Sequence, residues 1–331
     1  MATIQDPKAL GTANLAQQEY LSIPISVFQL DHLAHVDLYC KFEGIASPVL
    51  YRSAAIPITL RDIEELRDKG HRALYVLSSD YAQLDRSLNE SLHDILADSS
   101  IAPAERFAIL QTAAAMEMDL AFHMIKCDRY VTLSQRIADQ ITHLLDGENL
   151  IPQQLFSVVR HDYYTYTHMI NVAGFATLFA DLLGIGDPQT RDQITKGALL
   201  HDIGKRFIPA KILCKAEALT EDEWQLIKAH PQRGYEDLCH RSDLTTEQLL
   251  MVYSHHERCD GEGYPVGLVR EEIHPWARLL AIVDVFDAIT SARPYRKPMT
   301  VSQGLSYLES QSGSHFDPEM VQCWTSAMRQ N

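Results

Sequence analysis

Short stretches in the first part of the chain alternate apolar and polar residues, which is the pattern of half-buried strands. The clearest stretch covers residues 37–42, and residues 49–51 and 73–76 are shorter strand candidates. A helix is predicted to start near Thr59, between the second and third candidates, because apolar residues follow it at helical spacing. Further along, the spacing becomes helical throughout. We therefore expect residues 1–147 to form an α+β domain.

The second part of the chain follows a helical pattern from its start. Residues 146–152 contain glycine, asparagine and proline, so we place the boundary between two domains here. Beyond it, Thr220 and Glu223 form the signature of a helix N-terminus, and Pro275 stands where another helix begins. No strand alternation is visible in this half of the sequence. Residues 148–331 are therefore predicted to form an all-α bundle.

The charge and the cysteine content limit the classes of partner. The chain has 29 basic and 44 acidic side chains and a formal net charge of −15. Such a chain repels duplex nucleic acid and anionic membranes, although a locally basic pocket is compatible with a small phosphate ligand. No apolar run approaches the ~18 residues that a membrane span requires. The six cysteines are scattered without a CxxC pair, so we expect a reduced, cytoplasmic protein with no membrane association.

Polar side chains of the metal-ligand type interrupt apolar helices in the second half. The clearest case is the pair His201-Asp202, which directly follows three apolar residues. Buried polar groups need partners, and a metal ion would satisfy both side chains. Asp284 is similar, because apolar residues surround it in the sequence and a lone buried carboxylate is costly. The candidate ligands are His168, His201, Asp202, His230, His255, His256 and Asp284.

Each candidate alone has a plainer explanation, since a single histidine in a helix is most often an ordinary core or surface residue. Together they fit a metal site, because the facing helices of a bundle project ligands into a shared core. Imidazole and carboxylate groups suit ions such as iron, manganese or zinc. Asp287, three residues after Asp284, is expected either to support a ligand or to cap its helix.

The segments around these candidates resemble the HD-GYP family, a branch of the HD metal-dependent phosphohydrolases. The resemblance covers residues 150–325, with every motif in order. Its most specific parts are HDIGK and HHExxDGxGYP, which together are too specific to coincide by chance. The matching blocks are His201 to Lys205, Ile208 to Leu213, Leu219 to Trp224, His230 to Gly234, His255 to Pro265, Asp284 to Thr290, Arg293 to Arg296 and His315 to Pro318.

The resemblance implies a fold, an activity and a set of residue roles. Members of the family have an all-α catalytic domain that cleaves cyclic di-GMP, a bacterial second messenger. By position, the seven candidates above match metal ligands of the family. Lys205, Arg293 and Arg296 match its phosphate contacts. The signature loop beside the substrate pocket matches Gly263, Tyr264 and Pro265.

One position departs from the family pattern. Members with three metals carry a glutamate four residues before the first histidine ligand, and here that position is Tyr164. Because a neutral tyrosine is a poor ligand for a hard divalent ion, the resemblance predicts two metals per chain. Iron or manganese is expected, and zinc, nickel or cobalt would also suit the ligand set. The change also puts in doubt the second cleavage, from linear pGpG to GMP.

The chemistry of the candidates suggests a mechanism. Two divalent ions can bridge one water, lower its pKa and neutralise the charge that builds up on phosphorus. Asp202 is the natural bridging ligand, since each of its oxygens can reach one ion. We expect Lys205 to contact a phosphate oxygen or protonate the leaving oxygen, and Tyr264 to stack on guanine or brace its loop. We assign to one ion His168, His201 and Asp284, and to the other His230, His255 and His256.

Two other functions fit the same sequence. A degenerate receptor would bind the nucleotide with little turnover, and the change at Tyr164 is the one feature that favours it. The same chemistry on another cyclic dinucleotide is the second alternative, because no motif marks contacts to the base edges. The domain of residues 1–147 is expected to be regulatory, and a homodimer or a signalling-protein partner is left open.

Overall fold

The computed structural model divides the chain into two compact units. The first contains residues 1–101 and 108–113, and the second contains residues 102–107 and 114–331. The boundary predicted after residue 147 lies inside the second unit. That residues 1–147 and 148–331 have separate functions stays a prediction. The structure describes residues 20–24, 28, 36–41, 48–69, 71, 73–77, 79–80, 83, 92–122, 127–146, 150–159, 165–213, 215, 217–291 and 297–330.

A four-stranded antiparallel sheet is the main feature of the first unit, with the strand order β1-β4-β2-β3. Helix α2 (Leu60–Asp68) follows Thr59, whose backbone N–H and hydroxyl both donate to Asp62 at the helix start. The three strands predicted from alternation are confirmed, whereas β1 was not predicted. The strands are β1 (Tyr20–Pro24), β2 (Leu38–Cys40), β3 (Val49–Arg52) and β4 (Ala73–Leu77).

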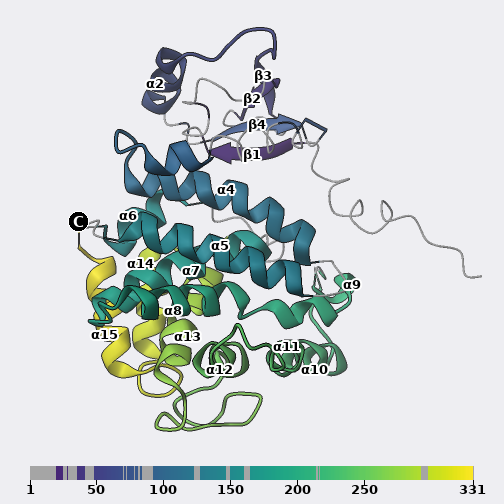
Figure 1. Ribbon diagram of the computed structural model, residues 1–331, viewed down its shortest axis with the longest axis vertical. Helices are drawn as coiled ribbons and strands as arrows, with labels where there is room; N and C mark the ends of the chain where they lie inside the picture. Colours follow the sequence, from purple (N-terminus) through teal and green to yellow (C-terminus); the bar gives the residue numbers. More distant parts are fainter. Residues whose placement is uncertain are drawn as a thin grey trace, which may run out of the picture. The chain divides into compact units, whose positions relative to one another are not determined.

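Helices form the second unit (Figure 1). Among the described residues after 150, the regular elements are helical apart from two isolated bridges, so the predicted all-α bundle is confirmed there. The predicted helix start at Thr220 and Glu223 is present as a capping box, and Pro275 opens α13. The elements are α4 (Pro103–Phe122), α5 (Asp128–Leu145), α6 (Pro152–Val158), α7 (Thr165–Leu182), α8 (Pro188–Leu200), the 3-10 helix η3 (Ile203–Phe207), α9 (Ala210–Leu213), α10 (Glu221–Lys228), α11 (His230–Leu238), α12 (Thr246–Ser254), α13 (Pro275–Thr290), α14 (Val301–Ser310) and α15 (Pro318–Met328).

Aromatic side chains pack around Trp324 of α15 in the core of this bundle. The Trp324 ring is fully buried, and its centroid lies 5.8 Å from that of Phe175 and 5.1 Å from that of Phe179, both on α7. Phe286 of α13 lies 5.7 Å away. Because α7 and α13 are buried along most of their length, they are the inner helices of the unit.

None of the helices that the structure describes has the length and hydropathy needed to cross a bilayer.

The end of helix α8 is anchored by a buried residue of α5. The hydroxyl of Tyr130 donates to the carbonyl of Leu199 at 3.1 Å and lies 3.0 Å from the sulfur of Met169 on α7. Leu199 stands two residues before His201 in the sequence. The contact therefore fixes the point at which the chain leaves α8 and enters the HDIGK motif.

We expect replacement of the Trp324 ring to cost more stability than replacement of an exposed tryptophan. Trp324→Ala should lower the free energy of unfolding by about 3–5 kcal/mol, because it leaves a cavity among aromatic side chains. The matched control is Trp224→Ala, since Trp224 is 46% exposed and should change stability by less than about 0.5 kcal/mol. Chemical denaturation followed by circular dichroism measures both values, and similar losses for the two variants would contradict the packing described above.

Candidate metal centre

The seven predicted ligands lie on three helices and on the segments that directly follow two others. His168 lies on α7 and Asp284 on α13, whereas His201 and Asp202 connect α8 to η3. His230 begins α11, and the pair His255-His256 directly follows α12. All of them are buried except His256, which is partly exposed. The structure therefore brings together side chains that lie up to 116 residues apart in the sequence.

The ligand atoms fall into two groups. One group contains His168, His201 and Asp202, and the other contains His230, His255 and His256. Within each group the possible ligand atoms all lie within 4.8 Å of one another. Asp284 joins the first group, because its Oδ1 lies 3.0 Å from Nε2 of His168 and 3.9 Å from Nε2 of His201.

Asp202 lies between the two groups. Its Oδ2 is 3.4 Å from Nε2 of His201, in the first group. Its Oδ1 is 3.1 Å from Nε2 of His230 and 3.9 Å from Nε2 of His255, in the second group. Each oxygen of this single carboxylate thus faces a different set of imidazoles, which is the arrangement that a ligand bridging two ions requires.

Backbone carbonyls orient three of the imidazoles. In each case the Nδ1–H donates to a carbonyl three residues earlier, at 2.6 Å for His201, 2.7 Å for His230 and 2.9 Å for His255. This bond fixes the tautomer, so that the Nε2 atom carries the lone pair. Since the Nε2 atoms are the ones that approach Asp202, the lone pairs are directed into the centre. The accepting carbonyls belong to Ala198, Ile227 and Val252.

Two polar atoms at this centre lack hydrogen bonds from the part of the chain that the structure describes. They are Nε2 of His201 and Oδ1 of Asp202, both fully buried. A buried polar atom without a partner costs about 1–3 kcal/mol. Divalent cations bound among these groups would satisfy both atoms, so the residues present fit a metal centre.

The pKa shifts at the second group favour the form that binds metal. Burial, followed by the proximity of His201 and His230, lowers the pKa of His255 to about 3. Burial, followed by the proximity of His255 and His230, also holds the pKa of His256 well below its usual value. Both imidazoles are therefore neutral near pH 7, as metal ligation requires.

His168 is held differently, between two carboxylates. Burial alone would lower its pKa, but hydrogen bonds to Asp284 and Asp287 raise the pKa of His168 to about 9. Its Nδ1 donates to Asp287 at 2.7 Å, and Asn171 donates to the other oxygen of Asp287 at 3.0 Å. Asp287 thus orients a candidate ligand, which is one of the two roles expected from the sequence. An ion bound at this position would take the place of the proton on Nε2 of His168.

Lys205 lies at the edge of the centre. Its Nζ donates to Oδ2 of Asp202 at 2.5 Å. Burial would raise the pKa of Asp202, but the charge of Lys205, followed by the contact with His201, holds it well below its usual value. Asp202 is therefore ionised and available as a ligand at neutral pH. Lys205 thus places a positive charge beside the carboxylate that lies between the two groups of ligands.

The signature loop covers the second group of ligands. The ring of Tyr264 lies 4.8 Å from that of His256 at an interplanar angle of 31°, and the bond between Tyr264 and Pro265 is cis. A Cβ atom at Gly263 would come within 2.4 Å of the backbone nitrogen of Arg258, so this turn needs glycine. Lys228, which the sequence did not single out, places its Nζ 6.0 Å from the centre of the Tyr264 ring.

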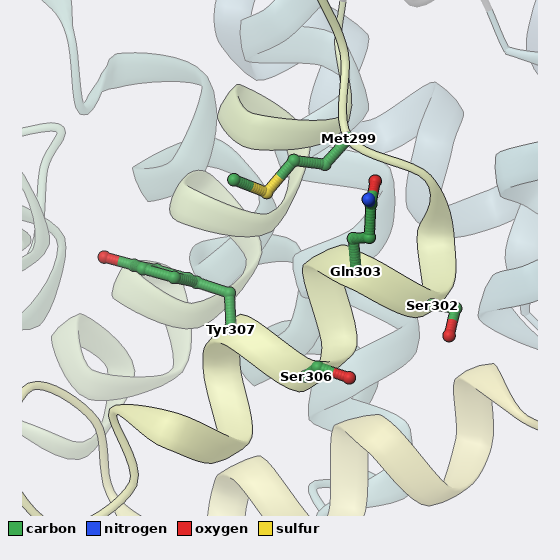
Figure 2. Close-up of a pocket in the computed structure, with 5 residues that line it drawn as sticks. All are labelled: Met299, Ser302, Gln303, Ser306 and Tyr307. Atoms are coloured by element: carbon green, nitrogen blue, oxygen red, sulfur yellow. The ribbon is translucent and has the colours of Figure 1, made fainter.

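Three predicted positions are not placed by the structure. Arg293 and Arg296, the expected phosphate contacts, lie outside the described residues, and so does Tyr164. A separate surface pocket is lined by residues of α14 and of the segment before it (Figure 2), and it contains none of the predicted ligands. Its lining residues are Met299, Ser302, Gln303, Ser306 and Tyr307.

Comparison with known proteins identifies the family. A family model described as HD domain matches residues 129–320. The chain belongs to the HD domain family. The HD-GYP branch indicated by the motifs is confirmed by the relatives, among them the cyclic di-GMP phosphodiesterase response regulator RpfG of Xanthomonas campestris. That protein is 38% identical over 58% of this chain and 51% of its own length.

Other relatives of this HD domain carry different names. The 3′3′-cGAMP-specific phosphodiesterase 3 of Vibrio cholerae is 37% identical over 47% of this chain and 34% of its own length. The chain spans about half or less of the length of these curated relatives. The solved structure of Bd1817, an HDG“Y”P protein from Bdellovibrio bacteriovorus, matches 94% of this chain and 100% of its own with a TM-score of 0.66. At 19% identity this match supports the fold alone.

We predict that a methyl group at Gly204 would disturb the metal centre. A Cβ there would lie 1.9 Å from the carbonyl oxygen of His230 and 2.7 Å from the nitrogen of Gly234, so η3 and α11 would have to separate. Gly204→Ala should therefore weaken metal affinity by about 10-fold or more, since ligands on both segments move. Metal titration followed by elemental analysis measures this loss.

The matched control for this experiment is Gly186→Ala. Nothing lies within 4 Å of a Cβ at Gly186, so that variant should bind metal as the unmodified chain does. Unchanged metal affinity in Gly204→Ala would contradict the close approach of η3 and α11.

Proposed function

We propose that this chain is a metal-dependent phosphodiesterase that hydrolyses cyclic di-GMP to linear pGpG. The observation that carries the proposal is the position of Asp202, whose two oxygens face two separate sets of imidazoles. Relatives such as the cyclic di-GMP phosphodiesterase response regulator RpfG indicate the substrate class. The neutral imidazoles of His255 and His256 and the ionised carboxylate of Asp202 belong to the donor set that such an enzyme needs.

Two divalent ions would supply a hydroxide at neutral pH and offset the negative charge of the reacting phosphate. Asp202 would bridge them. Lys205 would contact a phosphate oxygen or give a proton to the leaving 3′-oxygen, and its position against Asp202 supports either role. The first ion would be held by His168, His201 and Asp284, and the second by His230, His255 and His256.

The number and identity of the ions are part of the proposal. The two groups of ligands support two ions per chain, and Tyr164 in place of a glutamate is the reason to expect no third. Iron or manganese fits best with the family, while zinc, nickel and cobalt suit the same mixed donors. With two ions, pGpG is the proposed end product instead of GMP.

The remaining site residues are proposed to bind the substrate. Arg293 and Arg296 would hold the phosphate that is not being cleaved, because a guanidinium suits a phosphate group. The loop residues Gly263, Tyr264 and Pro265 would lie beside the nucleotide. Since the ring of Tyr264 already packs on His256, its contacts support the role of bracing the loop more than that of stacking on guanine.

A second substrate deserves a direct test. The relatives named 3′3′-cGAMP-specific phosphodiesterases are 37% identical to this chain, close to the 38% of RpfG. Identity therefore does not separate the two cyclic dinucleotides. The same centre would cleave either one, since the chemistry takes place at a phosphodiester common to both.

We expect the chain to convert cyclic di-GMP to pGpG when iron(II) or manganese(II) is added under reducing conditions. Chromatography of the products, with 3′3′-cGAMP as a parallel substrate, gives the activity, the preferred base and the extent of cleavage. Preferential cleavage of 3′3′-cGAMP would show that this dinucleotide, and not cyclic di-GMP, is the substrate. Binding of either nucleotide without any product would instead establish a receptor and overturn the proposed enzyme.

Removal of the bridging carboxylate should abolish both metal retention and turnover. We expect about two ions in the unmodified chain, and in Asp202→Ala a loss of bound metal together with a fall in turnover of more than about 100-fold. Asp222→Ala is the control, because Asp222 is exposed on α10. Elemental analysis and product assays measure the two effects. Full activity in the Asp202 variant, or three ions in the unmodified chain, would contradict the assignment.

A further inference from the structure

Glu257 directly follows the ligand pair His255-His256, yet its carboxylate is turned toward a later part of the chain. The side chain is only 2% exposed. Oε1 accepts from the backbone N–H of Val266 at 2.7 Å, and Oε2 accepts from that of Leu268 at 2.9 Å. The N–H of Gly267 lies between them, 3.2 Å from Oε1 and 3.0 Å from Oε2. Three consecutive amides therefore surround one buried carboxylate.

This arrangement closes the signature loop. A buried carboxylate is costly unless donors compensate its charge, and hydrogen bonds to an ionised acceptor are about twice as strong as neutral ones. Successive backbone amides that point inward form a concave site for an anion. Here the anion is a side chain of the same loop, so the three bonds tie residues 266–268 to the start of the loop at Glu257.

The closed loop places Tyr264 against a candidate ligand. The N–H of Tyr264 donates to the carbonyl of His256 at 3.2 Å, and the two rings are 4.8 Å apart. The turn before Tyr264 packs on the same backbone, since a Cβ at Gly263 would lie 2.5 Å from the Cα of Glu257. Moving residues 266–268 away from Glu257 would therefore also release the Tyr264 ring from His256.

We infer that Glu257 is a positioning residue of the metal centre, which holds the loop of residues 257–268 closed so that Tyr264 keeps the His256 imidazole in place. Its carboxylate oxygens are already used by the amides, so it acts through the loop and not as a ligand. Any effect on turnover rests on the proposed function. The effects on the loop and on metal affinity do not, because they need no substrate.

The test compares two substitutions in one loop. Glu257→Gln keeps the size of the side chain but turns an NH₂ group toward backbone donors, so at most one of the two acceptor oxygens remains. Glu262→Gln makes the same chemical change on an exposed side chain of the loop and is the control. Hydrogen exchange followed by mass spectrometry should show about 10-fold faster exchange of the amides at residues 266–268 in Glu257→Gln only.

Metal affinity is a second measurement of the effect on the loop. It is compared between Glu257→Gln and the control Glu262→Gln. Titration with cobalt(II), followed by its visible absorption, should show affinity about 10–100-fold weaker in Glu257→Gln and unchanged in Glu262→Gln. Glu257→Asp keeps the charge and should recover part of this loss. It also provides the comparison with the unmodified chain if the glutamine variant does not fold.

A double variant tests whether Glu257 acts through Tyr264. Tyr264→Leu removes the ring from His256, so adding Glu257→Gln to it should weaken cobalt affinity little further. Losses that simply add would show that Glu257 acts by another route and would overturn the inference. Unchanged exchange and unchanged cobalt affinity in Glu257→Gln would also overturn it. If the unmodified chain binds cobalt but cleaves no dinucleotide, the proposed function fails while this inference is still decided by exchange and affinity.

Discussion

The buried carboxylate of Asp202 is the group on which the arrangement of the second unit depends. It is 1% exposed and lies within 4 Å of three imidazoles and of the Lys205 ammonium. An ion taken out of water costs several kcal/mol unless charges and hydrogen bonds replace the solvent. The end of α8, the junction between α10 and α11 and the end of α12 therefore have to meet at this residue, because each delivers one of the imidazoles that surround it.

The geometry of these three helix ends is largely local. His201, His230 and His255 each follow the last turn of a helix, and each donates to a carbonyl three residues before it. Carbonyls in the last turn of a helix have no partner within the helix, so they are free to hold an imidazole. The same local hydrogen bond thus fixes the same tautomer in all three histidines. Tertiary packing then only has to bring the three helix ends together. The contact between Tyr130 and Leu199 is one example of that packing.

The sequence was informative where a polar residue stood in an apolar context. That signal singled out Asp202 and Asp284, and the structure buries both among the predicted histidines. It could not find Asn171, because the role of this residue depends on Asp287, which is 116 residues away. Glu257 stands out in the sequence only as part of a motif, since nothing in a linear pattern shows that its charge is compensated by amides nine to eleven residues later. Strand β1 was missed for a similar reason, because its pairing with β4 spans about 50 residues.

The negative charge of the chain bears on how this centre would bind an anionic substrate. A net charge of −15 repels a dianionic dinucleotide at long range, and Asp202, Asp284 and Asp287 add three carboxylates at the centre itself. Two divalent ions and the Lys205 ammonium would outweigh those three carboxylates and leave the centre locally positive. Binding of the proposed substrate would then depend on the metal ions, because the ligands alone present a net negative charge. The same ions that activate water would thus decide whether the substrate enters an otherwise acidic protein.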